Sequence, residues 1–471
     1  MYDTSQELWR LGAAETATAI RRKELSCREV TTSVLARIQA ANPEVNALTE
    51  VLDQAALAAA DAADRQVAAG GPLGVLHGVP VTTKVNVDQA GLATTNGSVA
   101  QRGLIAQEDA PVVANLRRAG AILVGRTNTA TYSVRWFTDN AVHGRTLNPW
   151  DAGTTPGGSS GGAAAAVASG MGAIAHGNDM GGSIRYPAYC CGVAGLRPTV
   201  GRIPAYNASA AAERGITAQL MSAQGPLARS VADLRLAMQA MAVFDARDPN
   251  CVPWPSAVEP AAQQGLRVAL CRSYPGIAAH PAVVQALDDA AHWLADAGYV
   301  VEEVQPPAMR EAAELWRVLG VEDGRRGISA AIRDHGDEAM RASQGYMEQG
   351  IAEGGRDAFQ DALAQRAGLA RQWSVFLDRF ALLLMPVSWQ PPAPQDEDTQ
   401  SWPRFRALLD AQSPLLATAC LGLPGMAVPT GMHGSVPMGV QLVAGRFRED
   451  LLLDAAQAIE ERAGFVALLN C

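Results

Sequence analysis

Two glycine-flanked serine turns lie at the two ends of one small apolar segment. The first turn, residues 157–162, holds Ser159 and Ser160, and the second, residues 180–183, ends in Ser183. Glycines beside a serine permit backbone angles that other residues resist, and they leave consecutive N–H groups uncovered. Such N–H groups can stabilise a developing oxyanion, so the pair of turns predicts a hydrolytic centre. The alternative is a pair of flexible turns that join a strand to a buried helix.

A nucleophilic serine needs a base, and histidine is the first candidate. Residues 157–161 satisfy the Gly-x-Ser-x-Gly pattern of the nucleophile elbow in α/β-hydrolases, with Ser159 as the nucleophile. That elbow needs a carboxylate and then a histidine later in the chain. The later histidines stand in no suggestive sequence context; they are His280, His292, His335 and His433. A Gly-x-Ser-x-Gly esterase is therefore the weaker alternative.

Lysine is the second candidate for the base. Lys84 stands alone in a short β-prone run, residues 76–86, among apolar and hydroxyl neighbours. It is either a strand-end residue that reaches solvent or a buried functional amine. A buried lysine can act as a base because desolvation lowers its pKa towards neutrality. Ser159 would then relay a proton from Ser183 to Lys84, beside N–H groups of residues 180–183 that form an oxyanion hole.

Helices and strands that alternate along the chain must position these residues. Apolar residues recur at helical spacing in several segments, among them 110–119, 230–241 and 280–297. Short apolar, β-prone runs predict strands, among them 121–124, 266–271, 299–304 and 380–387. An early helix is expected to end at Asn42-Pro43. The alternation favours an α/β architecture with a buried mixed sheet.

Composition excludes several classes of protein. The 471 residues carry a net charge of −9 and no basic run, which argues against a nucleic-acid partner. No apolar run reaches the ~18 residues of a membrane span, and the first residues lack the features of a signal peptide. The seven cysteines and seven histidines form no metal-binding pattern. We therefore expect a cytoplasmic protein with no membrane partner, no metal and no cofactor.

A long set of motifs resembles the amidase signature family. The spacings match that family, with 75 residues from Lys84 to Ser159 and 24 from Ser159 to Ser183. The segment 157–198 resembles the family's signature. Further matching runs cover nearly the whole chain; they are HGVPVTTKVNVDQAGLATTNGS, GRTN, NPW, SAQGPLARSVADL, GLPGMAVPTG and PMGVQLVAGRFREDLLL.

The resemblance implies a fold and a set of roles. The fold is a central twisted mixed β-sheet surrounded by α-helices, in one amidase domain over residues 1–471. Its parts are an N-terminal helical part (1–70), a signature core (71–245), a variable helical cap region (246–400) and the C-terminal part of the core (401–471). The resemblance implies that Ser183 is the nucleophile, Lys84 the base, and Ser159, which follows a cis peptide, the serine that bridges them. It also implies that the N–H groups of Met180, Gly181, Gly182 and Ser183 form the oxyanion hole. Asp179 and Arg185 would brace the loop.

The chain departs from the family's pattern at two places. It has Val85 where the family usually has aspartate after the lysine, which leaves open how Lys84 is oriented. It has Asn178 and Met180 where the family usually has threonines on either side of Asp179. We expect the second departure to change only side chains next to the oxyanion hole. Neither departure removes a catalytic atom.

The substrate is less defined than the reaction. The resemblance predicts hydrolysis of a small to medium amide, such as an aryl amide, a carbamate or a urea derivative, through an acyl-enzyme. Tyr132 and Trp136 could hold a flat acyl group between them, and Arg135 could pair with a substrate carboxylate. Core packing and a surface arginine are the alternatives. The full set of expected substrate-binding residues is Tyr132, Ser133, Val134, Arg135, Trp136 and Ser160.

Two further hypotheses invoke other classes of function. A glutaminase-type A subunit of an aminoacyl-tRNA amidotransferase would use the same triad inside a complex. A non-enzymatic binding module would leave the arrangement of Ser183, Ser159 and Lys84 unexplained. We expect a stand-alone amidase with a small-molecule substrate and leave open whether it forms a homodimer.

Overall fold

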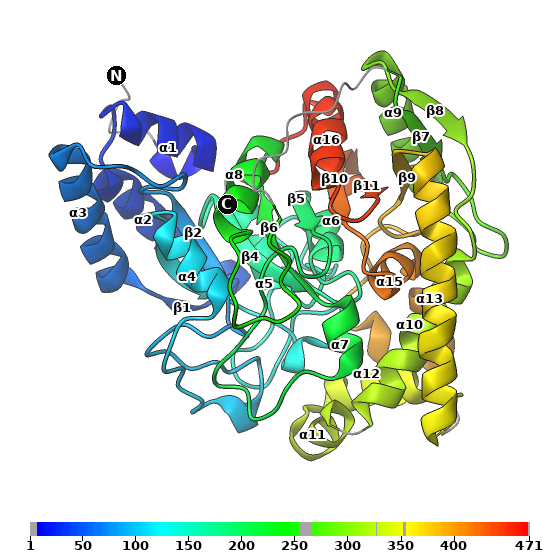
Figure 1. The fold of residues 1–471 in the computed structure, drawn as a ribbon. Coiled ribbons are helices and arrows are strands. Elements are labelled where there is room, and N and C mark those ends of the chain that lie inside the picture. The colour runs from blue at the N-terminus through cyan, green and yellow to red at the C-terminus, as the bar shows by residue number, and fades with distance from the viewer. Residues whose placement is uncertain (1–6, 255–264, 326, 352–354, 470–471) are drawn as a thin grey trace.

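One mixed β-sheet lies at the centre of the computed structural model, which describes residues 7–254, 265–325, 327–351 and 355–469 (Figure 1). Within these residues the sheet has eleven strands. They are β1 (Leu48–Val51), β2 (Pro80–Lys84), β3 (Ile122–Thr127), β4 (Ile174–Asp179), β5 (Ala194–Arg197), β6 (Ala223–Ala228), β7 (Arg267–Leu270), β8 (Val300–Glu303), β9 (Leu382–Pro386), β10 (Gly425–His433) and β11 (Val436–Ala444).

The strand order is β1-β3-β2-β4-β6-β5-β10-β11-β9-β7-β8. β2 pairs in parallel with β3 and β4, and β7 pairs in parallel with β8 and β9. The other neighbours in the sheet are antiparallel. The predicted α/β fold with a mixed sheet is confirmed.

Helices surround the sheet, with α1, α2 and α3 at one end of the molecule and the long α13 at the opposite end (Figure 1). Within the described residues no helix has both the length and the apolar character needed to cross a membrane. The helices are α1 (Ala13–Arg21), α2 (Cys27–Val45), α3 (Asp53–Ala69), α4 (Pro111–Arg118), α5 (Gly161–Ala168), α6 (Arg185–Cys191), α7 (Ile216–Met221), α8 (Val231–Met241), α9 (Pro281–Asp296), α10 (Met309–Gly324), α11 (Ile328–His335), α12 (Glu338–Glu348), α13 (Gly355–Arg379), α14 (Trp402–Ala411), α15 (Ser413–Cys420) and α16 (Glu449–Ala463).

Local sequence explains where several helices begin and end. Ser26 caps α2, since its hydroxyl accepts from the N–H of Glu29 while the Glu29 carboxylate accepts from Ser26 in return. α2 then continues through Pro43, so the expected end at Asn42-Pro43 is wrong by a few residues. The helix ends where Asn46 adopts a left-handed conformation with φ of 53°.

The helix between the two serine turns is buried on every side. All eight residues of α5 are glycine, alanine or valine, and none is exposed. A helix that is apolar all round belongs in a core rather than on a surface. α5 therefore runs inside the protein and carries the first serine turn at its N-terminal end.

The sheet brings the lysine and the serine turns to one edge. β2 and β4 are parallel neighbours, with Val81 opposite Ile174, so their carboxyl ends meet at the same edge of the sheet. Lys84 is the last residue of β2, and Asp179 is the last residue of β4. In open α/β sheets, ligands bind outside the carboxyl ends of strands. The topology therefore favours a functional site at this edge.

Candidate active site

The side chain of Lys84 lies completely inside the protein. Its exposed fraction is 0%, so the alternative of a strand-end lysine that reaches solvent is excluded. Burial lowers the pKa of Lys84 well below its usual value of 10.5, and the negative charge of Asp179 opposes this only in part. The fold thus favours a neutral amine at this position.

Three oxygen atoms surround the amine nitrogen Nζ of Lys84. Ser159 Oγ lies 2.7 Å from it, Asn178 Oδ1 lies 2.8 Å away and Ser160 Oγ lies 3.0 Å away. The amide oxygen of Asn178 can only accept a hydrogen bond. The hydroxyl of Ser160 donates to the carbonyl of Asn178 over 3.4 Å, so its oxygen is free to accept from the amine. A neutral amine has two N–H groups and one lone pair, which leaves the lone pair for the hydroxyl of Ser159.

The first serine turn depends on its glycines. The peptide bond between Gly158 and Ser159 is cis. A Cβ atom on Gly158 would lie 2.5 Å from the backbone of residues 135–137, and Gly157 has a φ of 77°. Any larger residue at Gly158 would push this turn away from the backbone on which it rests, so the position of Ser159 depends on the absence of a side chain there.

The second serine turn lies against the first. The N–H of Ser160 donates to the carbonyl of Ser183 over 3.3 Å, which joins the two turns directly. Ser183 is largely buried, with an exposed fraction of 8%. It follows Gly182, whose φ of 105° is strained for residues with a side chain. The structure therefore brings the three residues of the predicted triad, Lys84, Ser159 and Ser183, to one place.

Asp179 and Arg185 hold this second turn in shape. The carboxylate of Asp179 accepts from the N–H groups of Gly182 (2.7 Å) and Ile184 (3.2 Å) and pairs with the guanidinium of Arg185 at 2.9 Å. Burial alone would raise the pKa of Asp179, but the charges of Arg185 and Arg197 and these hydrogen bonds lower it to about 2. The aspartate is thus a charged brace.

The backbone N–H groups of the second serine turn, residues 180–183, differ in whether they already donate a hydrogen bond. Gly182, one of the four predicted oxyanion donors, already donates its N–H to Asp179. No hydrogen bond among the described residues engages the N–H of Met180, Gly181 or Ser183. These three donors remain available to a ligand.

Asn178, which contacts Lys84 Nζ, is held in turn by Asn86. Asn178 Nδ2 donates to Asn86 Oδ1 over 3.0 Å, and Asn86 Nδ2 donates to Ser133 Oγ over 2.9 Å. The expectation that the second departure affects only side chains next to the oxyanion hole is therefore wrong, because Asn178 contacts Lys84 itself. Asparagine at a position where the family usually has threonine was the sequence feature that could have pointed to this contact. Val85 is buried and does not hold the lysine through a side-chain charge.

Residues 132–136 lie beside the site, and their side chains differ in burial and in their hydrogen bonds. Tyr132 and Val134 are half-buried, and Ser133 contacts Asn86. The indole N–H of Trp136 donates to the carbonyl of Gly181 over 2.9 Å, so this ring lies against the catalytic turn. The expected contact of these residues with a substrate stays a prediction.

Arg135 is neither a surface arginine nor an unpaired one. It is buried, and its guanidinium forms two hydrogen bonds with the carboxylate of Asp398, at 2.7 and 2.8 Å. Burial opposes the charge, but Asp398 raises the pKa of Arg135 above its usual value. The positive charge expected for a substrate carboxylate is therefore already neutralised within the chain.

The histidine that contacts the backbone of Lys84 is engaged on both ring nitrogens. His176 Nδ1 accepts from the backbone N–H of Lys84 over 3.4 Å, and Nε2 donates to Gln224 Oε1 over 2.7 Å. Burial lowers the pKa of His176 to about 4, so the ring is neutral. Since Ser159 contacts Lys84 rather than a histidine, the Gly-x-Ser-x-Gly esterase receives no support from this geometry.

No group of His, Cys, Asp and Glu side chains in the described part of the chain is arranged to hold a metal ion.

The fold, the site and the comparisons with known proteins together define the class of the protein, an enzyme that hydrolyses amide bonds. The chain belongs to the amidase family, since the family model described as Amidase matches residues 29–453. The predicted resemblance to the amidase signature family is thereby confirmed.

Individual relatives point the same way. The chain is 46% identical over 462 residues to an indoleacetamide hydrolase of Bradyrhizobium diazoefficiens, covering 98% of this chain and 88% of the relative. It is 32% identical to the A subunit of the glutamyl-tRNA(Gln) amidotransferase of Carboxydothermus hydrogenoformans, with 98% of each covered. Among solved structures, 6-aminohexanoate cyclic dimer hydrolase superposes with a TM-score of 0.83 at 27% identity, with 98% of each chain covered. The higher identity to the hydrolase supports amide hydrolysis and gives the amidotransferase A subunit less support.

Proposed function

We propose that the chain hydrolyses the primary amide of an arylacetic acid, of the indoleacetamide class, through an acyl-enzyme on Ser183. The substrate class is supported by the 46% identity to an indoleacetamide hydrolase over nearly the whole chain. The observation that carries the mechanism is the contact of 2.7 Å between Lys84 Nζ and Ser159 Oγ inside a buried site. A cytoplasmic location remains a prediction of the sequence, and whether the chain forms a homodimer remains open.

Acylation uses Lys84 as the base. Ser183 Oγ attacks the amide carbon and gives its proton to Ser159 Oγ, while Ser159 gives its own proton to the lone pair of Lys84. The hydrogen bonds of Asn178 and Ser160 support this assignment because they engage the two N–H groups of the neutral amine and leave its lone pair facing Ser159. A base with a lowered pKa near the working pH is suited to both taking and returning a proton.

The tetrahedral intermediate carries a negative oxygen that needs hydrogen-bond donors. The N–H groups of Gly181 and Ser183, with Met180, are proposed as these donors, and Gly182 is proposed to serve Asp179 instead. Donors of this kind typically contribute about 10²–10³ in kcat each. When the C–N bond breaks, Lys84 returns its proton through Ser159 to the leaving nitrogen, which departs as ammonia.

Deacylation repeats the relay with water. A water molecule attacks the acyl carbon and its proton passes through Ser159 to Lys84. The collapse of the second intermediate breaks the bond to Ser183 Oγ, which recovers its proton from the relay. The products are the free acid and ammonia, and the enzyme returns to its starting state.

The test uses the purified chain alone. With indole-3-acetamide it should release ammonia and indole-3-acetic acid in equal amounts, whereas glutamine should give little ammonia. A fluorophosphonate should add one adduct to the wild type and none to Ser183→Ala, as measured by intact mass. Turnover of glutamine but not of the arylacetamide would favour the amidotransferase component. An adduct on Ser183→Ala would contradict the assigned nucleophile.

A further inference from the structure

Every carbonyl of the catalytic turn accepts a hydrogen bond from another part of the chain. Two of the four donors are indole N–H groups from distant segments, and two are backbone N–H groups. The bonds are Trp316 Nε1 to Met180 O (2.7 Å), Trp136 Nε1 to Gly181 O (2.9 Å), Tyr186 N to Gly182 O (2.8 Å) and Ser160 N to Ser183 O (3.3 Å). The turn is thus fixed through its oxygens, and the direction of its N–H groups follows from that.

A trans peptide points its C=O and its N–H in opposite directions. The bond from Trp136 to Gly181 O therefore sets the N–H of Gly182 on the far side, and that N–H does meet Asp179 there at 2.7 Å. By the same geometry, the bond from Trp316 to Met180 O sets the direction of the N–H of Gly181. That N–H has no hydrogen-bond partner among the described residues. Trp316 thus orients a donor that is free for the reaction.

The ring of Trp316 also packs on the turn. A Cβ atom added to Gly181 would lie 2.5 Å from Trp316 Cζ2, and one added to Gly182 would lie 2.7 Å from Leu415 Cδ1. The two glycines therefore fit closely under Trp316 of α10 and Leu415 of α15. A shift of either helix would move the turn.

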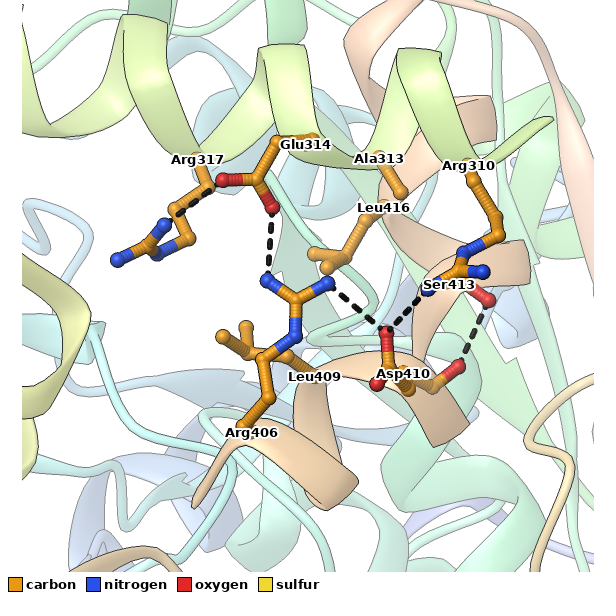
Figure 2. Close-up of a pocket in the computed structure, with 9 residues that line it drawn as sticks. All are labelled: Arg310, Ala313, Glu314, Arg317, Arg406, Leu409, Asp410, Ser413 and Leu416. Carbon is orange, nitrogen blue, oxygen red and sulfur yellow. Dashed lines mark hydrogen bonds and ion pairs between the residues drawn. The ribbon is translucent and has the colours of Figure 1, made fainter. Parts of the chain in front are cut away.

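An ionic network holds α10 against α14, the helix that precedes α15. Arg406 of α14 lies between Glu314 of α10 and Asp410 of α14 and contacts both at 3.0 Å (Figure 2). Arg310 of α10 reaches Asp410 at 3.7 Å, and Arg317, the neighbour of Trp316, contacts Glu314 at 2.7 Å. Two of these ion pairs, Arg406–Glu314 and Arg310–Asp410, join α10 to α14 near Trp316.

We infer that Trp316 is a positioning residue of the oxyanion hole, whose indole N–H holds the peptide between Met180 and Gly181 so that the N–H of Gly181 faces the developing negative charge. The inference rests on the proposed function, because it assigns the oxyanion to this turn. Trp136 plays a lesser part, since the N–H that it orients belongs to Gly182 and is engaged by Asp179 as well.

Replacement of each indole by a ring without an N–H tests the inference. Trp316→Phe should lower kcat for the amide about 10-fold with KM changed less than about 2-fold, because the donor acts mainly in the transition state. Trp136→Phe should lower it less. Trp150→Phe is the matched control, since the indole N–H of Trp150 also donates to a backbone carbonyl, that of Cys191 at 2.9 Å, and does not hold α10. It should leave kcat unchanged.

The rate of fluorophosphonate labelling separates this inference from the substrate assignment. Labelling also builds a negative oxygen at the turn but needs no particular acyl group. About 10-fold slower labelling of Trp316→Phe, with Trp150→Phe at the wild-type rate, supports the inference even if the wild type hydrolyses no arylacetamide. Labelling of Trp316→Phe at the wild-type rate overturns it. Should Trp316→Phe not fold, 3-benzothienylalanine at 316 keeps the shape of the ring without the N–H and is judged by the same rates.

Discussion

Replacing Asn178 by aspartate tests how the fold sets the basicity of Lys84. The two side chains have nearly the same shape, but the aspartate places a negative charge where the amide oxygen now lies 2.8 Å from Lys84 Nζ. An opposite charge stabilises the ammonium form, so the pKa of Lys84 must rise in Asn178→Asp. The ammonium form of Lys84 would then persist to a higher pH than in the wild type.

The distance gives the size of the effect. Two unit charges 2.8 Å apart attract by about 6 kcal/mol at an effective dielectric constant of about 20. The cost of burying the new carboxylate offsets much of this, and an adjacent opposite charge typically shifts a pKa by about 1–3 units. On the acid side of the profile, activity should therefore fall about 10-fold for each unit of that shift.

The assay is kcat/KM for amide hydrolysis as a function of pH, which reports the pKa of the base in the free enzyme. Activity of the wild type should be lost as pH falls and Lys84 takes up a proton. In Asn178→Asp this loss should begin about 1–3 pH units higher. Asn178→Thr, a neutral acceptor, is the control and should keep the acid limb near that of the wild type. An acid limb that does not move in Asn178→Asp would refute this account of Lys84.

Three further substitutions probe the base and the support of the site. Lys84→Ala should lower kcat by about 10²–10⁴, since it removes the general base, and the acid limb of the pH profile should disappear with it; a limb that persists would assign it to another group. Asp398→Ala should lower the free energy of unfolding in urea by about 3 kcal/mol, because it leaves the buried charge of Arg135 without its two hydrogen bonds. Asp396→Ala, which removes a half-buried carboxylate 3.5 Å from Arg135, should cost about 1 kcal/mol. Equal losses for the two variants would contradict a special role for the buried pair.

Much of the fold could be predicted from local patterns. The helical spacing at 230–241 and 280–297 corresponds to α8 and α9, and the apolar run at 380–387 contains β9. The order of strands in the sheet could not be predicted this way, because most strands pair with segments far away in the chain. The end of α2 was missed because Asn46, with its left-handed backbone, ends the helix after Pro43 rather than at it.

The site could be predicted where a residue's chemistry is unusual in its local sequence. Lys84 and the two serine turns meet this condition. Asn178, Trp316 and Asp398 do not, since their roles arise from partners that the chain brings from more than 90 residues away. Arg135 was predicted to bind a substrate carboxylate because no partner for its charge is visible in the local sequence. Its partner, Asp398, lies far away in the chain.

The burial of Lys84 makes the proposed base a product of folding. In an unfolded chain a lysine has an ordinary pKa near 10.4 and is almost wholly an ammonium ion at neutral pH. The pKa of the amine falls only once β2, β4 and the two serine turns have closed around it and excluded water. Under the proposed mechanism, a newly synthesised chain carries all the residues of the reaction and yet remains inert towards amides until its core is complete.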